Sequence, residues 1–498
     1  MGIEALLDMT SGVVPDRVAT GSTTRGRCFA DMARRAAGGA ALLTATGARH
    51  VVYLGVQSEV FPVAVYAAAA ASLPMTPLNY RLPDVDLAEL IGRLDRPVVL
   101  ADSEQRHRVP VGVPVLTTAE WFAHAAEAEP AGPPGNPSDV AVMLFTSGTT
   151  ARPKGVLLRH DHLMAYVLGS AEFLAAGDDD CALVAVPPYH IAGIASVLSN
   201  VYAGRRVAYL ADFTPRGWLE TVHREGVTHA LVVPTMLARV VRHLDGAPAD
   251  VPGLRSLAYG GAKLSASVLQ AALAAFPTTD FVNAYGLTET SSTIAVLGPE
   301  DHRAAFASDD PGVRRRLTSV GRPLPGVEVS IRGEHGREVG PEESGELWVR
   351  GPQVSGEYAG IGSVLDKDGW FPTRDVAWVD AAGYLFIDGR GDDTIVRGGE
   401  NIAPAEIEAV LDRHPGIAEV AVVGIPDEEW GQRTVAVVVS SDGDIPDAEG
   451  LRAWSRERLR SSRTPDEFVF RPTLPYTPTG KLLRRQLVAE LAARPTAS

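Results

Sequence analysis

The segment 144–155, Leu-Phe-Thr-Ser-Gly-Thr-Thr-Ala-Arg-Pro-Lys-Gly, constrains the chain more than any other. It follows an apolar run, 140–145, which predicts a buried strand. Its glycine and hydroxyl residues supply N–H and O–H donors for an oxyanion, and its lysine adds a compact positive charge. The segment predicts a loop that holds a triphosphate, although it lacks the Walker pattern G-x-x-x-x-G-K-[ST]. The expected contacts are Thr146, Ser147, Gly148, Thr149, Thr150 and Lys154.

Composition narrows the classes of protein to which the chain can belong. A length of 498 residues exceeds one ordinary core, so two or more domains are expected. The formal net charge of −15 argues against a nucleic-acid binder, whose phosphate contacts need a basic face. The two cysteines, Cys28 and Cys181, are too widely spaced to suggest a disulfide framework or a zinc site.

Targeting signals and membrane segments are not evident. The N-terminal residues lack the basic region and the long apolar core of a signal peptide. The richest apolar run, 61–73, is too short to span a bilayer and predicts a packed helix. We therefore expect a cytoplasmic protein without an integral membrane segment.

Buried strands alternate with helical segments between about residues 40 and 300. This alternation predicts an α/β domain of layered, mostly parallel sheets. The expected strands are 51–54, 98–101, 182–186, 207–210 and 230–233. The expected helices include 218–224 and 237–244.

The pattern changes after about residue 320. Short alternating segments with glycine-rich turns, clearest at 345–351, predict a small β-barrel-like subdomain that ends near residue 388. After a glycine- and aspartate-rich joint, the chain has a second α/β pattern. Its expected elements are helix 404–411, strand 417–423, strand 434–439 and helix 447–459. We expect a large N-terminal domain, 1–390, and a smaller α+β C-terminal domain, 391–498.

Three further motifs complete a set with the phosphate loop. They are Asn-Ala-Tyr-Gly-Leu-Thr-Glu-Thr at 283–290, Trp-Phe-Pro-Thr-Arg-Asp at 370–375 and Tyr-Thr-Pro-Thr-Gly-Lys at 476–481. In this order, and over almost the whole chain, the set resembles the adenylate-forming superfamily: acyl-CoA synthetases, peptide-synthetase adenylation domains and luciferases. The resemblance implies an N-terminal AMP-binding domain and a mobile C-terminal domain that carries the catalytic lysine.

The resemblance assigns a nucleotide site. Tyr285 would stack on adenine, Thr288 would touch the α-phosphate, and Glu289 would hold Mg²⁺, a hard cation that prefers oxygen ligands. Asp375 and Arg390 would bind the ribose, because a carboxylate accepts from both hydroxyls of a diol. Further ATP and AMP contacts would be Gly260, Gly261, Ala262, Asn283, Ala284 and Gly286.

Two residues beside these motifs differ from many relatives. Arg374 stands directly before the ribose-binding aspartate, where many relatives carry glycine. Lys263 follows the adenine-lining turn, where many relatives have proline or a small residue. Lys263 is either a solvated surface charge or a contact to the substrate or the nucleotide.

The acid would bind beside the segment 187–193, Pro-Pro-Tyr-His-Ile-Ala-Gly. His190 would gate or orient the carboxylate and would not be a general base, because carboxylates are already ionised at neutral pH. Lys481 would bridge the carboxylate and the α-phosphate and stabilise the charge that builds as they bond. The expected catalytic residues are Lys481, His190, Thr288 and Glu289. The expected acyl-pocket residues are His190, Ala192, Gly193, Gly261 and Gly286.

The C-terminal domain would act in a second step. By resemblance, Asp392 is the hinge about which this domain turns, and Gly399 borders the tunnel for the pantetheine arm. The arginine-rich segment 452–463 is either a solvated face or a surface that attracts the CoA phosphates or an acidic carrier protein.

These features together predict an ATP- and Mg²⁺-dependent ligase that activates a carboxylic acid as an acyl-adenylate and transfers it to CoA. Alternatives with the same first step use a carrier-protein thiol, an amine or nitrite as the acceptor. A degenerate binding or regulatory protein is disfavoured by the joint presence of Lys154, Glu289, Asp375 and Lys481. Small lining residues leave room for an aryl ring or a medium chain, but they do not identify the acid.

Overall fold

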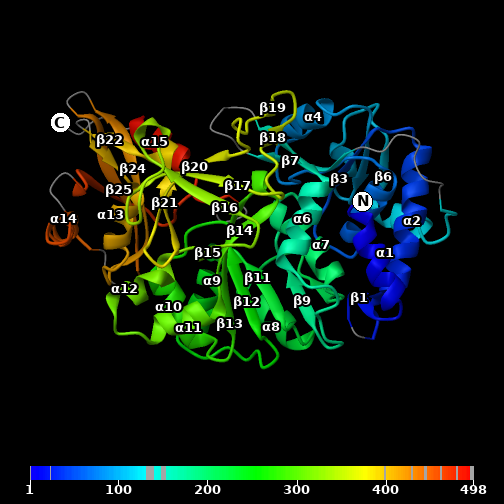
Figure 1. Cartoon of the computed structure of the whole chain (residues 1–498), viewed down its shortest axis with the longest axis horizontal. Helices are drawn as coiled ribbons and strands as arrows, with labels where there is room; N and C mark the ends of the chain where they lie inside the picture. The colour runs from blue at the N-terminus through cyan, green and yellow to red at the C-terminus, as the bar shows by residue number, and fades with distance from the viewer. Residues whose placement is uncertain are drawn as a thin grey trace.

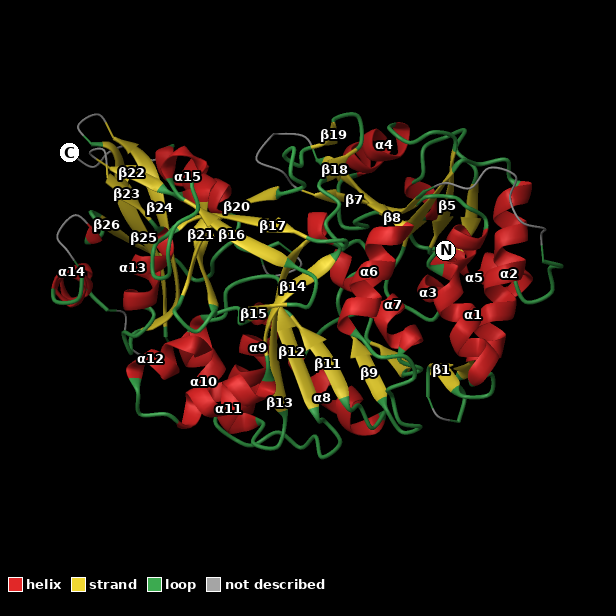
Figure 2. Ribbon diagram, viewed as in Figure 1, coloured by secondary structure: helices red, strands yellow, loops and turns green. Residues whose placement is uncertain are grey.

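The computed structural model describes residues 2–22, 24–130, 139–146, 153–397, 400–427, 430–441, 446–459, 463–477 and 481–493. Two large sheets with their helices form the body, and a four-stranded sheet lies between this body and an α+β unit at the C-terminal end (Figures 1 and 2). The C-terminal unit lies at the opposite side of the molecule from the N-terminal helices (Figure 1).

The first large sheet has nine strands in the order β15-β14-β13-β12-β11-β9-β10-β1-β2. Its central strands pair in parallel, which confirms the expected α/β architecture. The strands predicted at 182–186, 207–210 and 230–233 are β9, β10 and β11. The strands of this sheet are β1 (Val18–Thr20), β2 (Arg27–Cys28), β9 (Cys181–Val184), β10 (Arg206–Tyr209), β11 (His229–Val232), β12 (Ser256–Gly260), β13 (Asp280–Leu287), β14 (Ser292–Leu297) and β15 (Arg322–Pro323).

Helices α8 (Pro215–Arg224) and α9 (Pro234–Leu244) confirm the helices predicted at 218–224 and 237–244. Both begin with proline, which fits the first turn because no intrahelical partner awaits its missing N–H. The other helices of the body are α1 (Glu4–Val13), α2 (Phe29–Ala45), α3 (Val60–Ala70), α4 (Asp84–Gly92), α5 (Thr118–His124), α6 (His160–Ser170), α7 (Ile191–Tyr202), α10 (Ala266–Ala275), α11 (Pro299–Ala307) and α12 (Pro311–Arg314).

The second large sheet has eight strands in the order β19-β18-β8-β7-β4-β3-β5-β6. The apolar run beyond β3 forms the buried helix α3, as expected for a packed helix. In the part of the chain that the structure describes, no helix is both long and apolar enough to cross a membrane. The strands are β3 (His50–Leu54), β4 (Met75–Pro77), β5 (Pro97–Ala101), β6 (Val115–Thr117), β7 (Val140–Thr146), β8 (Lys154–Arg159), β18 (Glu357–Tyr358) and β19 (Gly362–Ser363).

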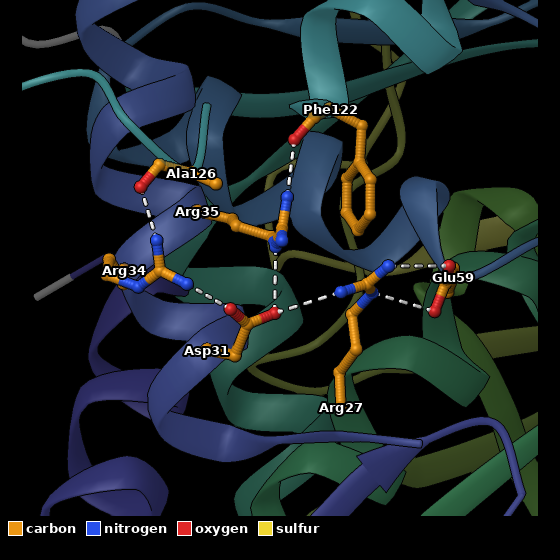
Figure 3. Close-up of polar contacts among 7 residues, drawn as sticks. All are labelled: Arg27, Asp31, Arg34, Arg35, Glu59, Phe122 and Ala126. Carbon is orange, nitrogen blue, oxygen red and sulfur yellow. Dashed lines mark hydrogen bonds and ion pairs between the residues drawn. The ribbon is translucent and has the colours of Figure 1, made fainter. Parts of the chain in front are cut away.

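An ion-pair network fixes the start of α3 against its neighbours (Figure 3). Asp31 in α2 accepts a hydrogen bond from Arg35 Nε at 2.8 Å and pairs with Arg27 at 3.7 Å. Arg27 also donates to Glu59, the residue before α3, at 3.0 Å. Arg35 reaches the carbonyl of Phe122 in α5 at 2.6 Å. These contacts hold the loop between β3 and α3 in one position.

The segment predicted to be barrel-like is instead an open antiparallel sheet, in the order β16-β17-β20-β21. Among the described residues, the edge strand β16 pairs only with β17 and the edge strand β21 only with β20, so the sheet does not close. The strand predicted at 345–351 is β17. The strands are β16 (Glu328–Arg332), β17 (Gly345–Arg350), β20 (Phe371–Val379) and β21 (Leu385–Arg390).

The C-terminal unit begins after a single 3₁₀ turn, η5 (Gly391–Asp393). Its three-stranded sheet, β24-β25-β26, carries apolar clusters of its own on both faces. The predicted helix 404–411 forms as α13, whereas the helix predicted at 447–459 is shorter. The elements are β22 (Ile395–Arg397), β23 (Glu400–Ile402), α13 (Pro404–Leu411), β24 (Ile417–Asp427), β25 (Gly431–Ser440), α14 (Ala448–Arg456), β26 (Glu467–Phe470) and α15 (Arg484–Ala492).

Candidate active site

The predicted phosphate loop connects two paired strands, β7 and β8. Thr146 ends β7 opposite Lys154, the first residue of β8, so both ends of the loop are fixed by strand pairing. The Lys154 ammonium lies 5.6 Å from the centre of the Tyr358 ring. The loop residues between these ends, Ser147, Gly148, Thr149 and Thr150, lie outside the described residues.

The predicted adenine-lining residues meet where β12 and β13 end side by side. Gly260 is paired with Ala284, and a Cβ on Gly260 would lie 2.1 Å from the Ala284 carbonyl oxygen. A Cβ on Gly286 would lie 1.8 Å from the Ser292 carbonyl oxygen. Only glycine permits these close backbone approaches. The neighbouring predicted residues are Gly261, Ala262 and Asn283. The side-chain amide of Asn283 donates a hydrogen bond to the Ser319 carbonyl at 3.0 Å.

Glu289, the predicted metal ligand, is held by both its backbone and its side chain. Its carbonyl accepts hydrogen bonds from the N–H groups of Ser355 and Gly356 at 2.9 and 3.2 Å. Its Oε1 accepts a hydrogen bond from the Tyr358 hydroxyl at 2.9 Å. Thr288 precedes it in a single 3₁₀ turn, η2 (Thr288–Thr290). The structure therefore fixes one carboxylate at the position where the resemblance expects Mg²⁺.

Asp375 and Arg390 form the centre of the site. They face each other on β20 and β21, and Arg390 Nε lies 2.9 Å from Asp375 Oδ1. Tyr285 donates its hydroxyl to Asp375 Oδ2. Asp375 is only 4% exposed. Burial raises the pKa of this carboxyl group, while Arg390 and the Tyr285 hydrogen bond oppose the rise. The structure thus brings the two predicted ribose-binding residues into direct contact.

Arg374 adopts a φ of +63°, in the left-handed region that favours glycine. Glycine, the residue that the resemblance leads us to expect there, would adopt this conformation without a steric cost. A non-glycine residue held in this region costs on the order of 1–3 kcal/mol, so the strands around it must impose the conformation.

Lys481 approaches this centre from the C-terminal unit. Loss of hydration lowers the pKa of its ammonium group, and nearby Arg390 lowers it further, whereas Asp393, Asp375 and Glu289 act in the opposite direction. The lysine is therefore within electrostatic reach of both predicted site carboxylates. Tyr476 and Leu482 form a β-bridge, and the Lys481 carbonyl accepts a hydrogen bond from the Thr477 N–H at 2.8 Å.

His190 lies directly before α7, at the edge of the predicted acid site. Burial lowers its pKa to about 4, so the imidazole is neutral at pH 7 and has no charge to offer a carboxylate. Ala192 and Gly193 lie in the first turn of α7. A Cβ on Gly193 would lie 2.7 Å from the Pro187 carbonyl oxygen and 3.0 Å from Gln57 Nε2.

A cavity of ≈ 390 Å³ adjoins this segment. Its walls come from the ends of β9 and β10, the start of α9 and the turn before α3, and Tyr476 of the C-terminal unit completes it. Gln57 lines the cavity and is 4% exposed, and neither polar atom of its side chain has a hydrogen-bond partner among the described residues. A buried amide without a partner is costly, so Gln57 is a polar group that this part of the structure leaves unsatisfied.

Sequence reasoning missed Tyr358 and Gln57. No motif marks either residue: Tyr358 lies in a two-residue strand, and Gln57 follows an apolar strand in an ordinary turn. Only the tertiary structure brings Tyr358 to Glu289 and Gln57 to the loop that contains His190.

Other predicted residues are partly placed. Asp392, the predicted hinge, lies in the turn η5 between the last strand of the four-stranded sheet and the C-terminal unit. Gly399 lies outside the described residues. In the arginine-rich segment, Arg452 pairs with Glu449, Arg463 pairs with Glu406, and Arg458 stacks on Trp454 at 3.6 Å. Over the described ranges, no cluster of three or more His, Cys, Asp or Glu side chains is arranged to hold a metal.

The chain matches two family models. One describes an AMP-binding enzyme and covers residues 8–359, and the other describes the C-terminal domain of AMP-binding enzymes and covers residues 406–481. These two regions contain most of the predicted site residues, from Thr146 to Glu289 in the first and Lys481 in the second.

Among similar proteins, a feruloyl-CoA synthase of an Amycolatopsis species is 34% identical, over 92% of this chain and 93% of the relative. A fatty acid–[acyl-carrier-protein] ligase of Streptomyces coeruleorubidus is 33% identical, over 88% of this chain and 86% of the relative. The crystal structure of ATP-bound MatB from Rhodopseudomonas palustris superposes with a TM-score of 0.87 at 26% identity, covering 99% of both chains. The chain therefore belongs to the AMP-binding enzymes of the adenylate-forming superfamily, as its motifs indicated.

Proposed function

We propose that this enzyme is an AMP-forming acid–thiol ligase that activates a carboxylic acid with ATP and transfers the acyl group to coenzyme A. One observation carries the proposal: Lys481, from the C-terminal unit, lies within electrostatic reach of Asp375, Glu289 and Arg390 of the body. A cation placed where negative charge develops is what stabilises the transition state when a carboxylate is activated.

In the first half-reaction, a carboxylate oxygen of the acid attacks the α-phosphorus of ATP, and pyrophosphate leaves. Asp375 and Arg390 would hold the ribose, while Lys154 and the loop 147–153 would hold the departing phosphates. Lys481 would bridge the attacking carboxylate and the α-phosphate, where negative charge accumulates. His190, neutral because of its low pKa, would orient the acid without adding charge.

Glu289 would hold Mg²⁺, which when bound neutralises phosphate charge and polarises the phosphoryl oxygens. Mg²⁺ usually binds through one or two carboxylates together with substrate phosphates and water, so a single fixed carboxylate fits this requirement. Tyr358 holds one oxygen of Glu289 through its hydroxyl and leaves the second oxygen for the ion.

In the second half-reaction, a thiol attacks the acyl carbon of the adenylate and AMP leaves. We propose that the unit 391–498 turns about Asp392 relative to the domain 1–390 and brings Gly399 to the thiol path. The name of the feruloyl-CoA synthase relative supports CoA as the acceptor, and the cavity beside Gln57 offers space for part of the acid or of the acceptor arm.

A carrier-protein thiol is the second candidate acceptor. The relative from Streptomyces coeruleorubidus is named as a fatty acid–[acyl-carrier-protein] ligase, which favours this alternative over an amine or nitrite. Both thiols belong to a phosphopantetheine arm, so the same site serves either acceptor.

The test is pyrophosphate release from ATP with a panel of aryl, medium-chain and dicarboxylic acids, each with and without CoA. We expect at least one acid to release pyrophosphate and to yield a CoA thioester when CoA is added. Pyrophosphate release that yields no CoA thioester would move the assignment to another acceptor. No pyrophosphate release with any acid would contradict the proposal.

A further inference from the structure

The interface between the body and the C-terminal unit contains a cation that the mechanism above leaves unused. The chain has four lysines, at positions 154, 263, 367 and 481, and two of them are predicted site residues. Lys263 follows β12 directly after the adenine-lining turn. Its ammonium donates a hydrogen bond to the Ala405 carbonyl in the first turn of α13, at 3.5 Å. Lys263 therefore joins the nucleotide side of the site to the unit that carries Lys481.

The charge of Lys263 acts on two carboxyl groups, which lie on opposite sides of the turn η5 along the chain. Asp388 lies on β21, before this turn, and Asp412 follows α13, beyond it. Burial raises the pKa of each carboxyl group, and in each case the positive charge of Lys263 acts against that rise. Lys263 is thus an electrostatic partner of both sides of the hinge at once.

A second interaction joins the same loop to the same helix. The Ser265 side chain acts to lower the pKa of Asp412, the residue that follows α13. Lys263 therefore contacts the start of α13, and Ser265 acts on a carboxyl group at its end. Beyond this loop, Arg242 on α9 lies 3.7 Å from Glu419 on β24. These contacts all cross from the body to the C-terminal unit.

From this geometry we propose that Lys263 is a positioning residue that holds the C-terminal unit in the adenylate-forming orientation. The inference rests on the proposed function. The contact of Lys263 with Ala405 and that of Arg242 with Glu419 exist in the orientation in which Lys481 is near Asp375 and Glu289. A rotation about residues 391–393 moves α13 relative to the loop and breaks these contacts. Lys263 therefore stabilises one of two orientations, so its removal should slow the half-reaction that uses this orientation and should not slow the other.

The size of the effect follows from the exposure of the residue. Lys263 is exposed, and exposed ion pairs are individually weak. One hydrogen bond and two partly exposed charge partners correspond to a population shift of about 2- to 10-fold. This is far smaller than the loss expected when a residue that touches the reacting atoms is removed.

The experiment compares Lys263→Met, Lys263→Arg and the matched control Lys367→Met, which replaces an exposed lysine between β19 and β20. Single-turnover adenylation is measured by pyrophosphate release, and thioester formation is measured from pre-formed acyl-adenylate. We expect Lys263→Met to slow adenylation by about 2- to 10-fold and to leave thioester formation unchanged or faster. Lys263→Arg should recover most of the adenylation rate, and the control should match wild type.

An activity-independent readout separates this inference from the proposed function. Hydrogen exchange of the α13 amides, without substrates, should be faster in Lys263→Met and in Asp412→Asn, and the double variant should add little to either. Equal loss of both half-reactions, or unchanged exchange in α13, would overturn the positioning role. If wild type activates no acid, the proposed function fails, and the exchange result alone decides whether Lys263 holds the C-terminal unit.

Discussion

Asp375→Asn tests the nucleotide site most sharply, because the change is nearly isosteric. Asp375 is 4% exposed and contacts both Arg390 and Tyr285. Asparagine retains one acceptor oxygen but loses the negative charge and one acceptor position. If Asp375 binds both hydroxyls of the ribose, one charge-assisted hydrogen bond is lost and the other is weakened.

The expected magnitude follows from these contacts. A hydrogen bond to a charged group contributes about 1.5–3 kcal/mol, so ATP affinity should fall about 10- to 150-fold. The loss of the charge partner of Arg390 should cost less stability than a fully buried pair would, because the Arg390 side chain is 36% exposed and water can solvate it. The variant should therefore remain folded while it binds ATP weakly.

The assay is calorimetric binding of ATP, 2′-deoxy-ATP and 3′-deoxy-ATP to wild type and variant. Wild type should discriminate against each deoxynucleotide, and Asp375→Asn should lose most of that discrimination, because the enzyme change and the ligand change remove the same contact. Asp380→Asn is the matched control, since Asp380 is 5% exposed and caps the turn between the same two strands. If Asp375→Asn discriminates as strongly as wild type, Asp375 does not bind the diol.

Three further outcomes follow from the same geometry. Asp392→Pro should allow adenylate to form and then stall before the thioester, because proline fixes φ in the turn η5; thioester formation at the normal rate would place the hinge elsewhere. Gly260→Ala should destabilise the fold by about 1–3 kcal/mol and weaken ATP binding, because the new Cβ would lie 2.1 Å from a backbone oxygen. The control Gly12→Ala should not destabilise the fold, because a Cβ on Gly12 would have nothing within 4 Å. Burial lowers the pKa of His50 from 6.5 to about 4, so the contribution of His50 to stability is fully present above pH 6.5. It falls by up to about 1.4 kcal/mol per pH unit between pH 6.5 and about 4, and it changes no further below pH 4. Urea unfolding of His50→Gln should show a shallower slope in this window, and an equal slope would refute the assignment.

The sequence predicted the layered α/β body because periodicity is strong in buried parallel strands. β9, β10 and β11 lie within two residues of their predicted ranges, since continuous apolar runs have few other interpretations. The prediction of a barrel-like subdomain was wrong. Alternation identifies strands, but it does not show how many strands join or whether the sheet closes on itself.

The residues of the candidate site also fall into two groups, those that the sequence could identify and those that it could not. Lys154, Glu289, Asp375 and Lys481 stand in motifs, so their chemistry and spacing could be interpreted along the chain. Tyr358 and Gln57 act through contacts with residues distant in sequence, and their neighbours in the chain carry no signal. The sequence likewise could not decide whether Lys263 is a surface charge or a contact residue. Only the structure, in which α13 lies beside Lys263, shows the contact.

The central claim is that Lys481 serves the first half-reaction and not the second, because the C-terminal unit presents it to Asp375 and Glu289 in one orientation. The most direct measurement is the separate rate of each half-reaction in Lys481→Ala, with circular dichroism to establish that the variant is folded. We expect adenylation to slow by about 10²- to 10³-fold, the usual cost of removing one charge partner of a transition state. Thioester formation from pre-formed acyl-adenylate should stay close to the wild-type rate. Equal loss of both half-reactions in a folded variant would contradict the account.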